Sequence, residues 1–328
     1  MVSYIIRRFF YMLISMALLS FVSFVIIEMP PGDFAEMRIR ALEASGSRVD
    51  EAMIDNIRRQ FGYDQPFMTR YFNWATDIVT EGDFGISMGW NRSVTDMIGT
   101  VLPFTIVLSI ATLIFTYAMA IPIGVLSAVR QYSISDYFFS FVGFIGVALP
   151  DFLLSLVIMY YLLTYFDVSP GGLFSQEYEN APWSLAKIWD LAQHLIVPIV
   201  VTGMSGTALL IRTMRATLLD ELSKDYVDTA RMKGVPYWRA IFKYPVRIAI
   251  NPILSTIGWL LPVIVSGSTI VSIVLNLPTV GPLLIGALLN QDMFLAGGII
   301  FILSALTLLG TFLSDMILAV ADPRIRFE

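Results

Sequence analysis

The chain has 328 residues, of which 56% are hydrophobic and only 14% are charged, with a net charge of −5. Soluble domains carry about a quarter charged residues, so this composition excludes a soluble enzyme fold. Cysteine is absent and His194 is the single histidine. Disulfides, thiolate nucleophiles, and cysteine- or histidine-based metal sites are therefore excluded as well.

Long uncharged stretches define the predicted elements. Four intervals of at least 21 residues contain no Asp, Glu, Lys or Arg: 97–129, 191–211, 248–291 and 293–314. A helix needs about 20 apolar residues to cross a bilayer. Six spans are predicted, at about 9–27, 101–129, 137–165, 194–213, 248–275 and 294–318. We expect a short apolar re-entrant or interfacial segment at 276–292. The predicted fold class is an all-α polytopic membrane protein with six transmembrane helices.

The residues between the first two spans, 28–100, are predicted to form a small external helical cap domain. Ser47 and Asp50 favour the start of a first helix that ends at Gly62. Pro66 then opens a second helix, whose aromatic stripe consists of Phe67, Tyr71 and Trp74. The predicted division is therefore a cytoplasmic N-terminus with the first span (1–27), the external cap (28–100) and a five-span core (101–328).

Lysine and arginine are distributed unequally between the two sides of the membrane. With the N-terminus inside, thirteen of them fall in the predicted cytoplasmic segments, and only Lys187 falls in the external segments that follow spans three and five. Short cytoplasmic loops are enriched in basic residues. Both termini are therefore predicted to be cytoplasmic.

The sizeable cytoplasmic segment is the loop 212–247, which carries eight of these basic residues. Ser223 is expected to cap a first helix, Gly234 to end it in a left-handed turn, and Pro236 to start a second helix. We expect a helix–glycine–helix elbow that projects from the membrane. A basic loop lying on lipid headgroups would have a similar composition, so the order of the residues has to distinguish the two.

That order resembles the EAA loop of binding-protein-dependent ABC importer permeases. The family signature is Glu-Ala-Ala, three residues, Gly, nine residues and Ile-x-Leu-Pro. Asp228, Thr229 and Ala230 hold the triad positions here, and Gly234 has the expected spacing. The distal end, Tyr244-Pro-Val-Arg247, departs from the signature and resembles the peptide-importer branch. The ATPase-coupling residues that the resemblance implies are Asp225, Asp228, Thr229, Ala230, Lys233 and Gly234.

Further motifs in the family's order extend over nearly the whole chain. They are Met29-Pro-Pro-Gly-Asp33, Phe61-Gly-Tyr-Asp-Gln-Pro66, Gly82-Asp-Phe-Gly85 and Asp322-Pro-Arg-Ile-Arg326. One external motif differs, because Ser272 replaces a Glu and Pro278-Thr-Val-Gly281 replaces Pro-Gly-x-Gly. Since parts of this branch are similar to oligosaccharide importers, an oligosaccharide is the alternative to a peptide-class solute.

The resemblance implies a permease subunit, not an enzyme, in the cytoplasmic (inner) membrane of a bacterium or archaeon. Its implied solutes are oligopeptides or dipeptides. Its implied partners are a second, non-identical permease, two ATP-binding subunits, an external solute-binding protein and membrane lipid, with no nucleic acid. No cofactor is expected in this chain, because ATP and Mg would be bound by the partner subunits and no Gly-rich phosphate loop with its lysine is present. The cap and the segment 276–292 are the expected docking surface for the binding protein.

Two other classes of membrane protein would require different residues. An intramembrane aspartyl protease would need Asp151 and Asp315 at one depth. Asp151 is expected roughly 20 Å from the cytoplasmic end of span three, whereas Asp315 lies at the inner end of span six, so this function is rejected. A secondary transporter would need several intramembrane ionisable groups, and only Asp151 is of that kind. Asp151 is the candidate pathway residue, beside a kink expected at Pro150, with a helix-cap or interhelical hydrogen bond as its structural alternative.

Overall fold

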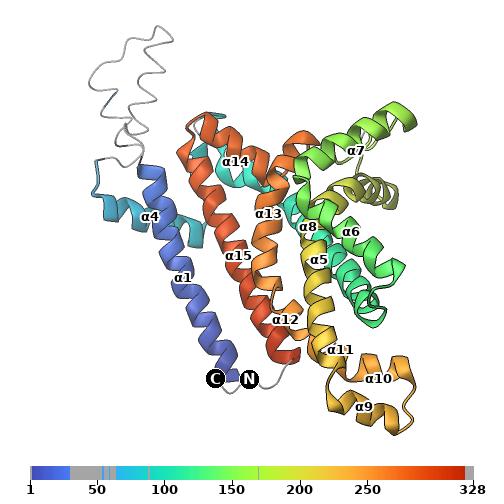
Figure 1. The fold of residues 1–328 in the computed structure, drawn as a ribbon. Helices are drawn as coiled ribbons and strands as arrows, with labels where there is room; N and C mark the ends of the chain where they lie inside the picture. Colours follow the sequence, from blue (N-terminus) through green and yellow to red (C-terminus); the bar gives the residue numbers. More distant parts are fainter. Residues whose placement is uncertain are drawn as a thin grey trace. The chain divides into compact units, whose positions relative to one another are not determined.

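In the computed structural model, residues 2–29, 54, 59, 64–87, 89–168 and 170–321 are described (Figure 1). These residues are almost entirely helical, with one short antiparallel pair, β1 (Ile86–Ser87) and β2 (Arg92–Ser93). Three sequence predictions lie wholly or largely outside the described residues. They are the first cap helix between Ser47 and Gly62, the turn that follows Met29, and the C-terminal motif that begins at Asp322.

Long apolar helices dominate the described chain. Five are long and apolar enough to cross a bilayer: α1 (Val2–Glu28), α5 (Val94–Val129), α8 (Leu185–Leu222), α13 (Ile257–Val274) and α15 (Met293–Ala321). A sixth span is obtained if α6 (Ile134–Ala148) and α7 (Asp151–Phe166), which are bent by 106° at their junction, are counted together. The predicted all-α polytopic fold is confirmed.

The break between α6 and α7 has a local cause. Leu149 has an extended conformation, with φ of −92° and ψ of 130°, as expected for a residue that precedes proline. Pro150 has φ of −59° and ψ of 137° and lacks the N–H that would continue the α6 ladder, so α7 starts anew at Asp151. The kink expected at Pro150 is therefore a complete change of helix direction.

The region predicted as span five begins later than expected. Residues from 245 onward form two short helices, α11 (Pro245–Ala249) and α12 (Asn251–Leu254), before α13 begins at Ile257. Prolines at or next to the first positions of α11 and α12 start each piece but cannot extend the preceding one. The short apolar segment expected after this span contains helix α14 (Val280–Leu289).

The chain divides into two compact units, each described by itself below. One comprises residues 1–12, 101–283 and 306–328, and the other comprises residues 13–100 and 284–305. Within the described part of the first unit, the core follows α8, where Leu210, Met214 and Leu218 are buried. Buried side chains of α5, α10 (Tyr237–Lys243), α11, α12 and α13 complete this cluster. The segment 212–247 therefore shares one hydrophobic core with the spans that flank it.

The second unit contains the predicted aromatic helix, α4 (Phe67–Thr80), which follows Pro66 as expected. Its stripe packs on Phe21 and Phe24 of α1, with ring centroids 5.3 Å apart for Phe21 and Tyr71 and 5.5 Å apart for Phe24 and Trp74. Arg70 forms an ion pair of 2.8 Å with Glu28. Because aromatic pairs contribute more than their buried area alone, α4 is firmly attached to α1.

Candidate functional site

The elbow is made by α9 (Asp225–Met232), a turn at Gly234, and α10. In Figure 1, α9 and α10 lie next to each other beyond α11. The first helix begins at Asp225, and the expectation that Ser223 caps it is wrong. Ser223 ends α8 in a helical conformation, and its hydroxyl donates back to the Asp220 carbonyl over 2.9 Å. Lys224 instead holds the N-cap position of α9, which has no side-chain cap hydrogen bond.

The turn between the two helices depends on Gly234, as predicted. Its φ is +77°, a value that L residues rarely adopt. Its N–H donates to the Arg231 carbonyl over 2.9 Å, and the Val235 N–H donates to the Ala230 carbonyl over 3.3 Å. No atom lies within 4 Å of where a Cβ would stand. Gly234 is therefore required by backbone conformation, and its outer side is open.

The inner face of the elbow is apolar and packs on the membrane core. Val227 and Ala230 of α9 are buried, and so are Ala240 and Ile241 of α10. Ile241 belongs to the same buried cluster as Leu218 of α8. Ala230 therefore points inward, and the elbow is attached to the spans by packing.

The outer face carries most of the predicted coupling residues. Asp225, Asp228, Thr229, Lys233 and Gly234 are exposed, so of the six predicted coupling residues only Ala230 is buried. Arg231 lies 3.8 Å from Asp228 in a surface ion pair, which has little effect on stability. The five residues thus form one accessible patch on α9 and the turn.

The outer face of the elbow also has an apolar part. Met232 of α9 is 86% exposed, and Tyr237, Trp238 and Phe242 of α10 are exposed as well. The rings of Tyr237 and Trp238 are 5.7 Å apart, and those of Trp238 and Phe242 are 6.1 Å apart. Large apolar side chains that gather at a surface mark an interaction site. The spacing of the aromatic residues along α10 indicated an aromatic face in the sequence. The same spacing was also consistent with a helix that lies on the membrane surface.

Polar contacts join the elbow and α11 to the end of α8. The Thr217 hydroxyl donates to the Ala249 carbonyl over 3.1 Å. Glu221 accepts hydrogen bonds from Lys224 and from the Tyr226 hydroxyl, each over 2.5 Å. Burial, reinforced by the Glu221 carboxylate, raises the pKa of Tyr226 above its ordinary value, so this hydroxyl remains a donor. Neither Glu221 nor Tyr226 was among the residues that the motif predicted.

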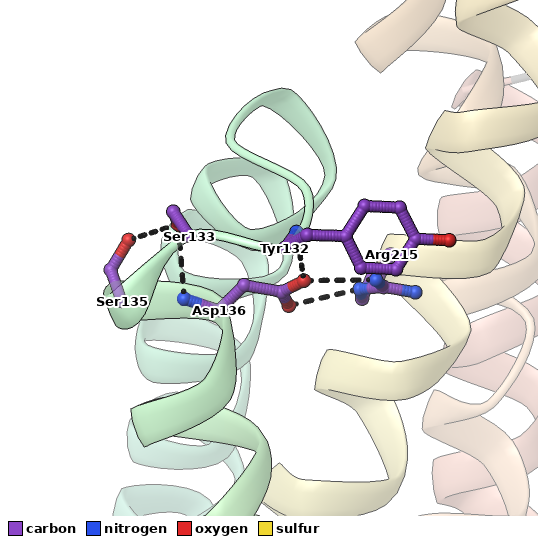
Figure 2. Close-up of polar contacts among 5 residues, drawn as sticks. All are labelled: Tyr132, Ser133, Ser135, Asp136 and Arg215. Carbon is purple, nitrogen blue, oxygen red and sulfur yellow. Dashed lines mark hydrogen bonds and ion pairs between the residues drawn. The ribbon is translucent and has the colours of Figure 1, made fainter.

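A second polar junction lies at the start of α6 (Figure 2). The Arg215 guanidinium of α8 donates two hydrogen bonds to Asp136, over 3.0 Å from Nε and 2.9 Å from Nη2. The Tyr132 N–H donates to the same carboxylate over 3.0 Å, and Ser133 caps α6 by accepting from the Asp136 N–H. Because a bidentate pair of this kind fixes the geometry of its two partners, it holds α6 to α8.

Asp151 lies at the first position of α7 and is partly buried. A Cβ on Gly267 of α13 would stand 4.0 Å from its Oδ2 atom. In the described part of the chain its carboxylate has no hydrogen-bond or ion-pair partner, while its carbonyl accepts from Ser155. Asp315, by contrast, forms an ion pair of 3.2 Å with Arg8. Asp151 is thus an unpaired acid beside a small residue of a neighbouring helix.

Within the second unit, the buried Asp292 organises a compact surface. Its Oδ2 atom accepts from the Ser87 hydroxyl over 2.5 Å and from the Gly89 N–H over 3.0 Å. Its Oδ1 atom accepts from the Leu295 N–H over 3.1 Å and so caps α15. Asp292 therefore joins the β1–β2 hairpin to the turn between α14 and α15, where Leu289 is 80% exposed.

No group of three His, Asp or Glu side chains in the described ranges is placed to hold a metal ion. The elbow patch contains donors, acceptors and apolar groups, but it has no nucleophile paired with a base. Its chemistry is that of a contact surface. The arrangement can bind a partner and transmit movement to α8 and α11.

Comparison with known proteins places these features in a family. Residues 120–327 match the family described as the inner membrane component of binding-protein-dependent transport systems, and residues 1–110 match the N-terminal part of such membrane components. The chain is 31% identical over 328 residues to the oligopeptide transport system permease protein AppB of Bacillus subtilis, with 100% of both chains covered. It is 28% identical over 328 residues to the glutathione transport system permease protein GsiC of Shigella flexneri, again with 100% of both covered.

Proposed function

Because the chain belongs to the family of inner membrane components of binding-protein-dependent transport systems, we propose that it imports peptide-class solutes. Members of this family are multi-pass permease subunits of ABC importers. They are not enzymes and have no cofactor of their own, and they work with ATPase and solute-binding partners. The peptide class is supported by relatives whose names specify oligopeptides and glutathione.

The observation that carries the coupling role is the two-sided elbow. Its inner face, including Ala230 and Ile241, is continuous with the core around α8, while its outer face exposes charged and aromatic side chains. A partner that grips the outer face would therefore displace α8 and α11 together. ATP and Mg are assigned to the partner ATPases, two per complex. The elbow itself supplies the mechanical connection.

The six spans of this chain are proposed to form half of the translocation pathway, with a second, non-identical permease providing the other half. Asp151 is proposed to line this pathway. An unpaired carboxylate inside a membrane segment is costly and is a functional candidate by default. The Asp151 carboxylate, which lies near the small Gly267, is proposed to attract a positively charged solute group, such as the amino end of a peptide.

Both termini are proposed to be cytoplasmic, which places the elbow inside and the Asp292-centred surface outside. The solute-binding protein is proposed to dock on that external surface, which consists of the β1–β2 hairpin and the α14–α15 turn. Trp90 and Leu289 are exposed there, and Asp292 fixes the backbone beneath them. The buried Asp292 acts as the support of this surface and makes no contact with the partner.

The test is to purify the native complex and reconstitute it in proteoliposomes with its solute-binding protein. An isotope-labelled peptide digest should enter the vesicles only when ATP is present on the side of the membrane that the elbow faces. Excess unlabelled peptides should compete for uptake, and oligosaccharides should not. Competition by oligosaccharides alone would refute the peptide class, and recovery of the chain without any ATPase would refute the importer role.

A further inference from the structure

Glu221 occupies an unfavourable position by every local rule. It lies in the last turn of α8, where the helix dipole is negative and a basic residue would be preferred. It is also only 9% exposed, so its carboxylate has lost most of its water. A residue that violates local preferences needs a compensating interaction, and such residues concentrate at functional positions.

The compensation comes entirely from the chain that enters the elbow. Lys224 donates to one carboxylate oxygen, Oε1, over 2.5 Å, and Tyr226 donates its hydroxyl to the other, Oε2, also over 2.5 Å. Lys224 is the residue just before α9, and Tyr226 is in its first turn. Each oxygen thus has a separate donor, and hydrogen bonds to a charged acceptor are the stronger kind.

The location of this contact distinguishes it from the other attachments of the loop. Ile241 attaches α10 by packing, and the hydrogen bond from Thr217 attaches α11. The first helix, α9, is held by the burial of Val227 and Ala230, which permits sliding and rotation, and by the directional bond from Tyr226. Directional bonds fix orientation in a way that apolar contact does not.

We propose that Glu221 and Tyr226 form a clamp that fixes the orientation of α9 on the end of α8, and that they act as positioning residues for coupling ATP hydrolysis to transport. This inference rests on the proposed coupling role of the elbow. With the clamp closed, a displacement of α9 by the ATPase moves α8. With the clamp open, α9 yields by itself and part of the movement is lost.

Tyr226→Phe is the direct test, because it removes the donor oxygen and keeps the ring. In proteoliposomes that contain the full complex and its binding protein, we expect normal recovery of the ATPases and continued ATP hydrolysis. Labelled peptide imported per ATP hydrolysed should fall by roughly threefold or more, since one bond to a charged group is lost. This ratio separates coupling from stability, because a merely less stable complex loses both activities in proportion.

Two further variants complete the cycle. Glu221→Gln keeps an acceptor oxygen for Tyr226 and should retain a higher import-to-hydrolysis ratio than Glu221→Ala. The double variant Glu221→Ala with Tyr226→Phe should be no worse than Glu221→Ala alone, because the two residues act through one contact. The matched control is Tyr11→Phe, at an exposed tyrosine whose hydroxyl has no hydrogen bond in the described residues. It should leave the ratio unchanged.

The outcomes distinguish this inference from the function on which it rests. An unchanged ratio in Tyr226→Phe, with Gly234→Leu still losing the ATPases, would overturn the clamp alone. A proportional loss of hydrolysis and import would also overturn it, since that assigns Glu221 and Tyr226 to stability. An ATPase association that is insensitive to Gly234→Leu would refute the elbow as the coupling site.

Discussion

Gly234 allows backbone strain and partner contact to be separated by a pair of substitutions. Its φ of +77° makes any residue with a Cβ costly by about 1–2 kcal/mol. Since no atom lies within 4 Å of the Cβ position, this chain adds no steric penalty, and Gly234→Ala and Gly234→Leu should lower its stability by the same amount. Any difference between them must come from a partner.

If the ATPase covers this turn, the leucine side chain will be forced into a packed interface. Overpacking costs about 1–3 kcal/mol, and each 1.4 kcal/mol weakens binding about tenfold. We therefore expect the affinity for the ATPase subunits to be about tenfold lower in Gly234→Leu than in Gly234→Ala. The assay is ATPase co-purification titrated against subunit concentration, together with thermal unfolding of each variant.

Gly82 provides the matched control for strain. Its φ is +67° and nothing lies within 4 Å of its Cβ position, so Gly82→Leu imposes the same kind of backbone cost in the other unit. Gly82→Leu should lower thermal stability by a similar amount without changing ATPase affinity. Equal ATPase affinities for Gly234→Ala and Gly234→Leu would refute the reasoning, because they would show that the open side of the turn stays in solvent.

Three other changes probe separate parts of the account. Ala230→Glu buries a charge without a partner and should abolish recovery of the ATPases while membrane insertion, followed by fractionation, is retained. Asp136→Asn removes the negative charge from a nearly buried ion pair and should lower the free energy of unfolding by about 1.5–3 kcal/mol. Truncating Arg215 in addition should lower it little further. A double-mutant cycle in thermal unfolding measures both effects. Asp151→Asn should reduce peptide uptake with normal assembly, and unchanged uptake would assign Asp151 to helix structure.

The elements that sequence reasoning predicted are those set by local chemistry. Gly234 predicts a left-handed turn that ends one helix, and Pro236 predicts the start of the next helix. The structure has both features. Pro150 likewise predicts a break in span three. The 106° angle between α6 and α7 was not predictable, because it depends on how each helix packs on its neighbours. The prediction that Ser223 caps α9 was wrong because a serine can lie at the start of one helix or at the end of another.

The contacts that escaped prediction join residues that are distant or locally disfavoured. The ion pair between Asp136 and Arg215 spans 79 positions, so nothing in either segment indicates the other. Glu221 is only five positions from Tyr226. An acidic residue at the C-terminal end of a helix is unfavourable by itself, however, and the sequence did not indicate that Lys224 and Tyr226 compensate for it. The exposed aromatic face of α10 fitted a membrane-lying helix equally well until Ile241 was found in the core.

We propose that the outer face of the elbow is cytoplasmic and is held by an ATPase. Because the chain has no native cysteine, Met232→Cys, at an 86% exposed position, carries a single photo-crosslinker. Irradiation of the transport-active complex should join this subunit to an ATPase, whereas Leu289→Cys on the proposed external surface should form no such product. Absence of the ATPase adduct from Met232→Cys, or its formation from Leu289→Cys, would contradict the account.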